Sequence, residues 1–178
     1  MKTISDEYKK IQQELHKDPK YGLASKYFAP IVTQLIKNFH INSISDYGAG
    51  KKKLYDALNE LNCTPKYYLP YDPAFPEYGA PKAADLVCCI DVLEHIEPHL
   101  IDNVINELSD ITSNLGFFTI HMGPARKILS DGRNAHLIQK PSSWWLEKLI
   151  KKFEIINLIE HNFMGKGFWL LVKPKDIN

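Results

Sequence analysis

Residues 84–98 constrain the fold of this chain more than any other stretch. An apolar run over 84–90 predicts a buried β-strand, and three polar residues, Asp91, Glu94 and His95, follow just past its end. Ligands of open α/β sheets bind at the carboxyl ends of the strands. Two carboxylates and an imidazole at such an end therefore indicate a functional site.

A second predicted strand end has a different character. Residues 43–50 read as a short strand that runs into the turn Asp46-x-Gly48-x-Gly50. Glycine lets the chain pass close beneath a ligand because it has no side chain in the way. A dinucleotide-binding turn has a third glycine that packs the helix on the strand, and Lys53 stands there instead. Hydride transfer with a nicotinamide or flavin cofactor is therefore disfavoured.

Predicted helices and strands alternate along the chain. Apolar spacing predicts helices over 4–17, 24–39, 51–61, 98–113 and 142–153, and strands over 42–46, 66–71, 84–90, 116–121, 154–160 and 167–173. The segments 74–83 and 123–140 contain proline and glycine and are expected to be loops. The last two strands are expected to pair antiparallel through Gly165. This order predicts an α/β sandwich with a mostly parallel sheet.

Length, charge and cysteine content limit the class of protein. A chain of 178 residues that is 44% hydrophobic is expected to form one domain, 1–178, with a real core. The net charge of +1 gives no case for a nucleic-acid coat or a membrane-surface protein. No apolar run approaches the ~20 residues that span a bilayer. The three cysteines, Cys63, Cys88 and Cys89, fit core thiols in a reducing compartment, so a cytoplasmic location is expected.

The order strand, Asp46-x-Gly48-x-Gly50, helix, strand, Asp72 resembles the class I S-adenosylmethionine-dependent methyltransferases. The resemblance covers about residues 42–173 and implies a Rossmann-like sandwich with S-adenosyl-L-methionine as the cofactor. It also implies that Asp72, 26 residues after Asp46, accepts hydrogen bonds from the ribose hydroxyls. The cofactor-binding residues it implies are Asp46, Tyr47, Gly48, Gly50, Asp72, Pro73 and Asp91.

The same resemblance divides the chain into two parts. Residues 1–40 are expected to form two helices that cover the substrate pocket as a lid, and residues 41–178 the Rossmann-like core. Tyr21, Ser25 and Tyr27 lie between these helices and are candidate substrate contacts.

The chain departs from the family after the second strand. Only 19 residues separate Asp72 from Asp91, where typical members place a further helix, strand and helix. We therefore expect a sheet one strand shorter than usual. The residue that usually binds adenine is missing with that crossover, and Phe75 or Tyr78 is expected to cover the adenine instead.

The sequence Asp91-x-x-Glu94-His95, followed by His136 shortly before a helix, resembles two groups of metal-dependent O-methyltransferases. These are the ubiquinone-biosynthesis type and the small-RNA 3′-terminal type. The resemblance implies that Asp91, Glu94, His95 and His136 hold a divalent cation such as Mg²⁺, which binds the substrate hydroxyls and lowers their pKa. Aspartate at the first position is shorter than the glutamate of those groups.

A metal-free interpretation stays open. In many small-molecule methyltransferases the Leu-Glu-His stretch shapes the pocket and binds no metal. His136 or His95 would then be the general base, since imidazole titrates near neutrality. His121, at the end of a predicted strand, is a further candidate. Arg133 is a candidate for binding an anion, because its guanidinium matches carboxylate and phosphate, or an ordinary exposed loop residue.

The leading prediction is methyl transfer to a small-molecule acceptor at a hydroxyl oxygen, with His136, His95 and Asp91 as the catalytic residues. RNA 3′-terminal 2′-O-methylation is the enzymatic alternative, and the nearly neutral net charge counts against it. A non-catalytic member of the fold, which binds a nucleotide or a protein partner, is the third possibility, and the missing crossover favours it.

Overall fold

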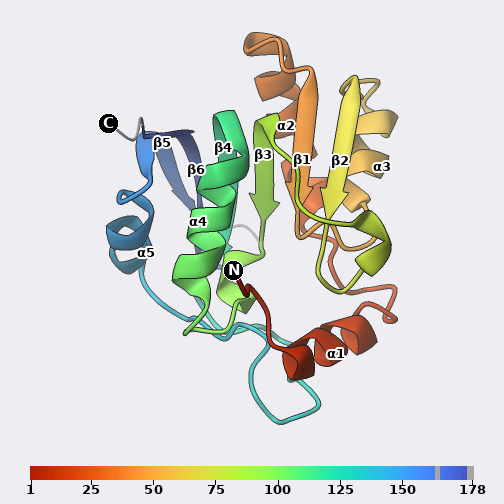
Figure 1. The fold of residues 1–178 in the computed structure, drawn as a ribbon, viewed down its shortest axis with the longest axis vertical. Helices are drawn as coiled ribbons and strands as arrows, with labels where there is room; N and C mark the ends of the chain where they lie inside the picture. Colours follow the sequence, from red (N-terminus) through yellow and green to blue (C-terminus); the bar gives the residue numbers. More distant parts are fainter. Residues whose placement is uncertain (163–164, 176–178) are drawn as a thin grey trace.

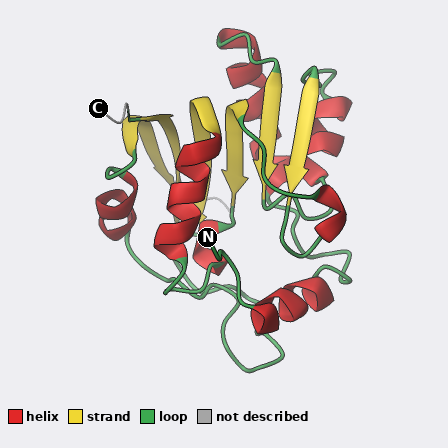
Figure 2. Cartoon of the chain, in the orientation of Figure 1, coloured by secondary structure: helices red, strands yellow, loops and turns green. Residues whose placement is uncertain are grey.

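The structure is a computed structural model, which describes residues 1–162 and 165–175. It has one β-sheet with helices packed on both faces (Figures 1 and 2). The helices are α1 (Asp6–Leu15), α2 (Ser25–Asn38), α3 (Lys53–Glu60), α4 (Ile101–Ile111) and α5 (Ser142–Leu149), with short 3₁₀ helices η1 (Pro76–Tyr78) and η2 (Leu93–His95). The strands are β1 (Ser43–Tyr47), β2 (Tyr67–Tyr71), β3 (Ala84–Ile90), β4 (Thr112–His121), β5 (Phe153–His161) and β6 (Gly167–Pro174).

The sheet has six strands in the order β2-β1-β3-β4-β6-β5. The first four run parallel, whereas β6 is antiparallel to both of its neighbours. The predicted α/β class, the C-terminal antiparallel pair and the shortened sheet are thereby confirmed. The chain passes from β2 to β3 through residues 72–83 and η1, so β2 is left at the edge of the sheet.

Two apolar cores explain why the run over 84–90 is hydrophobic without alternation. Leu86, Cys88 and Ile90 pack on one face with α2 and α3. Val87 and Cys89 pack on the other face with α4 and α5. A parallel strand buried on both faces must be apolar at successive positions, and six of the seven β3 residues are buried.

Three predicted boundaries were wrong. The fifth helix ends at Leu149 and not at residue 153, because Phe153 already belongs to β5 and pairs with Pro174 of β6. Pro98 lies in a turn, and α4 begins only at Ile101. The fourth strand begins at Thr112, four residues earlier than predicted, because Thr112 already pairs with Ala84 of β3. Tertiary pairing extends this strand beyond its apolar stretch.

The two N-terminal helices differ in their packing. The second, α2, belongs to the core beside α3. The first, α1, lies beyond the C-terminal ends of the parallel strands (Figure 1). There it forms a third small core with the loop that follows β4, through Tyr8, Leu15, Leu129 and Ala135. None of the helices in the described ranges is long and apolar enough to cross a bilayer.

Candidate active site

A cavity of about 810 Å³ is lined by residues at the strand ends and by residues of α1. All seven residues predicted to bind the cofactor line it, and so do His95, His121 and His136. The candidate substrate contacts Tyr21, Ser25 and Tyr27 line it as well. The structure thus brings the two predicted motifs, separated by a whole helix and strand in the sequence, into one space.

The turn after β1 requires its two glycines. Gly48 has a φ of +79° and Gly50 a φ of +47°, in the left-handed region that disfavours other residues. A Cβ on Gly48 would overlap the side chain of Val92, which follows β3. The backbone N–H groups of Gly48 and Ala49 donate to the carbonyl oxygen of Tyr71, which ties the turn to the end of β2.

Asp72 is held rigidly in the cavity wall. One of its oxygens accepts a hydrogen bond from the Gly50 N–H at 2.9 Å and the other from the Ala74 N–H at 2.8 Å. Burial raises the pKa of Asp72 above its ordinary value. His16, at the end of α1, places its Nε2 3.9 Å from this carboxyl. Burial lowers the pKa of His16 to about 4, so the imidazole is neutral at pH 7.

Asp46 and Tyr47 lie deeper. Asp46 is buried and accepts a hydrogen bond from the Tyr68 hydroxyl. Burial raises the pKa of Asp46 to about 7. The Tyr47 hydroxyl donates to Glu107 of α4 at 2.5 Å, so this end of the side chain is engaged by the core helix.

The expected adenine cover is not part of the cavity lining. Phe75 and Tyr78 stack on each other with ring centroids 5.3 Å apart, and neither lines the cavity. The Tyr78 hydroxyl donates to the Gly50 carbonyl oxygen, which holds the ring outside. His16 and Tyr21 line the cavity instead, and no pattern in the sequence marked His16, which ends an ordinary amphipathic helix.

Asp91 sits in an unusual backbone conformation at the end of β3. Its φ is +52°, a region in which Asp and Asn are enriched among residues other than glycine. The Thr119 hydroxyl accepts from the Asp91 N–H at 2.9 Å and donates to the Asp91 carboxylate at 2.6 Å. This reciprocal pair of hydrogen bonds holds the Asp91 carboxylate in one orientation in the wall of the cavity.

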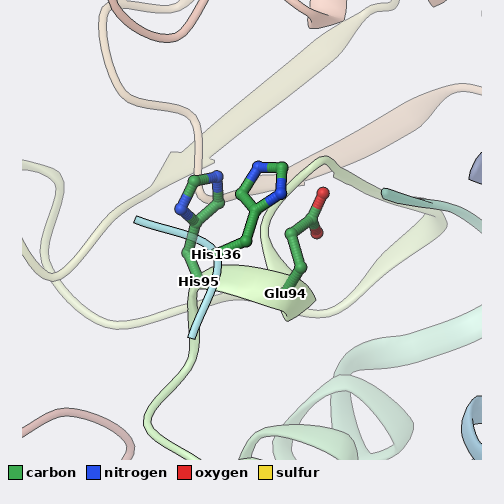
Figure 3. A group of neighbouring side chains, drawn as sticks. All are labelled: Glu94, His95 and His136. Carbon is green, nitrogen blue, oxygen red and sulfur yellow. The ribbon is translucent and has the colours of Figure 1, made fainter. Parts of the chain in front are cut away.

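Glu94, His95 and His136 come together as a cluster, drawn in Figure 3. Their ligand atoms all lie within 4.8 Å of one another. Glu94 and His95 come from η2, and His136 comes from the loop that follows β4. Asp91, the fourth residue predicted to bind a metal, is not among these close neighbours, because Thr119 holds its shorter side chain.

Peptide carbonyls fix the tautomers of the two histidines. His95 Nδ1 lies 2.8 Å from the Ala135 carbonyl oxygen, and His136 Nδ1 lies 2.7 Å from that of Gly123. A carbonyl only accepts, so each Nδ1 carries the proton and each Nε2 keeps its lone pair. Burial lowers the pKa of His95 to about 3 and also lowers that of His136. Both rings are therefore neutral at pH 7 and can bind a cation or take a proton.

Glu94 is fully buried beneath the cavity. One carboxyl oxygen accepts from the His121 N–H at 2.9 Å, and Oε2 has no hydrogen-bond partner among the described residues. Burial, reinforced by nearby Asp91, raises the pKa of Glu94 well above its ordinary value. A buried carboxyl oxygen without a partner is costly unless it holds a proton or a cation. The donor set of one carboxylate and two imidazoles fits a divalent cation.

No protein-family model and no curated protein matches the sequence. Solved structures share the fold over nearly the whole chain. One is a 1,6-didemethyltoxoflavin N1-methyltransferase from Burkholderia thailandensis with S-adenosylhomocysteine bound. Its TM-score is 0.65 at 14% identity, and the similar region covers 99% of this chain and 92% of that protein's chain.

Two further methyltransferases are similar. Magnesium protoporphyrin IX methyltransferase from Synechocystis PCC 6803, also with S-adenosylhomocysteine, has a TM-score of 0.58 at 12% identity over 96% of this chain and 95% of its own. The mitomycin 7-O-methyltransferase MmcR has a TM-score of 0.63 at 14% identity over 93% of this chain and 60% of its own. The chain therefore has the class I methyltransferase fold, while identities this low leave its activity to be argued from the site.

Replacing Asp46 by Asn is expected to stabilise the ligand-free protein at pH 8 and to do so less at pH 5. The folded-state pKa of about 7 lies above that of the unfolded chain, so the wild type loses stability as pH rises from about 4 through 7. Asn removes the buried charge and still accepts the Tyr68 hydrogen bond. We expect a gain of roughly 1–3 kcal/mol at pH 8 in urea unfolding.

The control is Asp110→Asn, at an exposed position of α4, which should leave the free energy of unfolding unchanged at both pH values. An equal effect of Asp46→Asn at both pH values would contradict the burial argument.

Proposed function

We propose that this chain transfers a methyl group from S-adenosylmethionine to a hydroxyl oxygen of a small-molecule acceptor. The observation that supports it most is that one cavity is lined both by the glycine turn with Asp72 and by Asp91, His95 and His136. A methyl donor and an oxygen acceptor must meet within such a space, since methyl transfer depends above all on proximity and orientation.

The cofactor end would be held by the chain's own rigid groups. The carboxyl of Asp72 is fixed by two backbone N–H groups and keeps lone pairs for the ribose hydroxyls. The turn at Gly48 leaves space for the methionine part, with Asp46 beneath it. The bound cofactor would supply an electrophilic methyl group on a sulfonium sulfur.

The acceptor end would activate the hydroxyl. Nε2 of His136 is a neutral acceptor and would take the hydroxyl proton as the oxygen attacks, with Nε2 of His95, whose pKa burial lowers to about 3, as the weaker alternative base. Asp91, whose carboxylate is held by Thr119 in the cavity wall, would orient the acceptor or the cofactor. For this reaction the protein needs to remove the hydroxyl proton and to orient the acceptor toward the methyl group.

A divalent cation is the finer part of the proposal. Glu94 and the Nε2 atoms of His95 and His136 would be its protein ligands, since the three residues are close, Glu94 Oε2 has no hydrogen-bond partner among the described residues, and the Nδ1 atoms of both histidines are held by carbonyls. Such a cation would lower the pKa of an acceptor hydroxyl. The two carbonyls that hold the Nδ1 atoms would orient the ligands, as partners of metal-bound histidines commonly do.

The wild type is expected to bind S-adenosylhomocysteine in isothermal titration, and Asp72→Asn to weaken binding roughly 10–100-fold. The reason is the loss of charge-assisted hydrogen bonds to the ribose, worth about 1.5–3 kcal/mol. Glu77→Gln changes an exposed carboxyl nearby and should bind as the wild type does. If the wild type bound no S-adenosylhomocysteine, a non-catalytic member of the fold would be favoured instead.

Mn²⁺ titration with electron paramagnetic resonance tests the cation. We expect one site in the wild type, and a loss of affinity of about tenfold or more in Glu94→Gln and His136→Ala. Both variants should keep their affinity for S-adenosylhomocysteine and lose methyl transfer. His99→Gln, at an exposed position, is the matched control. Mn²⁺ binding that survives both substitutions would remove the metal from the proposal, and turnover that survives would remove these residues from catalysis.

A further inference from the structure

The chain between Gly123 and His136 forms a short hairpin at the mouth of the cavity. Ile128 and Asn134 form an antiparallel bridge, and the Ala135 N–H donates to the Lys127 carbonyl oxygen at 3.0 Å. The Asn134 amide group closes the base, since it accepts from the Ala125 N–H and donates to the Ala125 carbonyl oxygen, both at 2.9 Å. The backbone is therefore fixed on both sides of residue 126.

The hairpin is also fastened to the site. Leu129 and Ala135 pack into the small core with α1. The carbonyl oxygen of Ala135 accepts from His95, one of the clustered histidines. Arg126 therefore has a defined position relative to His95, because both are tied to the same two hairpin strands.

Three basic side chains gather at this mouth, and two of them have no acidic partner among the described residues. Arg126, Lys127 and Lys20 line the cavity. Within the described ranges, neither Arg126 nor Lys20 forms an ion pair with a carboxylate; Lys127 lies 3.5 Å from Asp18. Arg133, for which the sequence left an anion-binding role and an ordinary loop role open, is paired with Asp131 of the same hairpin at 2.6 Å.

The carboxylates that line the cavity are engaged elsewhere. Their hydrogen-bond donors are Tyr68 for Asp46, the Gly50 and Ala74 N–H groups for Asp72, Thr119 for Asp91, and the Ser5 N–H for Glu97. The cavity thus has acids with internal partners on its walls and, at its rim, two bases, Arg126 and Lys20, that form no ion pair within the described residues. This separation of charge selects for a ligand that is negative at one end.

We propose that Arg126, with Lys20 and Lys127, forms an anion subsite, and that the methyl acceptor is a hydroxy compound with a carboxylate or phosphate group that binds there. The inference rests on the proposed function, for which it names the class of acceptor. The guanidinium of Arg126 matches either anion with two parallel hydrogen bonds. When the anionic group of the acceptor binds at the rim, the hydroxyl of the acceptor points inward to the histidines.

A small acceptor is favoured over RNA by the extent of the patch. Three cations surround one opening, and the net charge of the chain is only +1. RNA-binding surfaces follow several phosphates and carry a matching stripe of basic residues.

Two probes, inorganic phosphate and acetate, test the subsite in ¹⁵N-resolved NMR titrations of the full chain in low salt. We expect saturable shifts of the amides of residues 125–127, and a weakening of at least about tenfold in Arg126→Gln. Lys140→Gln removes an exposed cation of the same loop that does not line the cavity, and should bind as the wild type does. Tighter binding of phosphate than of acetate would identify a phosphate ester as the acceptor, and the reverse a carboxylic acid.

Shifts absent from residues 125–127, or unchanged in Arg126→Gln, would overturn the subsite. A 3′-hydroxyl oligoribonucleotide that bound more tightly than phosphate, with a steep salt dependence, would overturn the small acceptor in favour of RNA. S-adenosylhomocysteine titrated into the same samples separates the two claims. If S-adenosylhomocysteine binds but neither anion does, only the subsite is rejected. If an anion binds but S-adenosylhomocysteine does not, the proposed function is rejected.

Discussion

The parallel pairing of β1 with β3 is the constraint on which the site depends. With Asp46 opposite Cys88, both strands end at the same edge of the sheet. The glycine turn then lies directly against Val92, and the backbone after β3 must turn away at once, which it does through the positive φ of Asp91. Two short motifs that are far apart in the sequence become neighbouring walls of one cavity for this reason.

Burial then sets the chemistry of the walls. It keeps His95 and His136 neutral and raises the pKa of Glu94, so the cluster has lone pairs and no fixed positive charge of its own. The orientation of the rings comes from the hairpin after β4, whose carbonyl groups accept the Nδ1 protons. The same hairpin carries Arg126, so ring orientation and charge at the mouth depend on one piece of backbone.

The sequence predicted what is local or repeats with a regular spacing. It identified the strands, the turn at Gly48 and Asp72 at the end of β2. The grouping of Glu94, His95 and His136 came from the family resemblance, which also included Asp91, and the structure leaves Asp91 outside this group. It could not predict contacts that only tertiary packing creates, such as Thr119 with Asp91 or the placement of His16 beside Asp72. Phe75 is the clearest case, because an aromatic residue near a predicted ligand site has the same appearance in a sequence whether it faces the cavity or stacks outside it.

The most direct test of the account is a crystal structure of the protein with S-adenosylhomocysteine. The account predicts the ribose on Asp72, the amino-acid part at the Gly48 turn, and the sulfur facing His136 across open space in the same cavity. A ligand bound outside this cavity would contradict it, and so would a sulfur separated from His95 and His136 by the protein, because the two walls would then not serve one reaction.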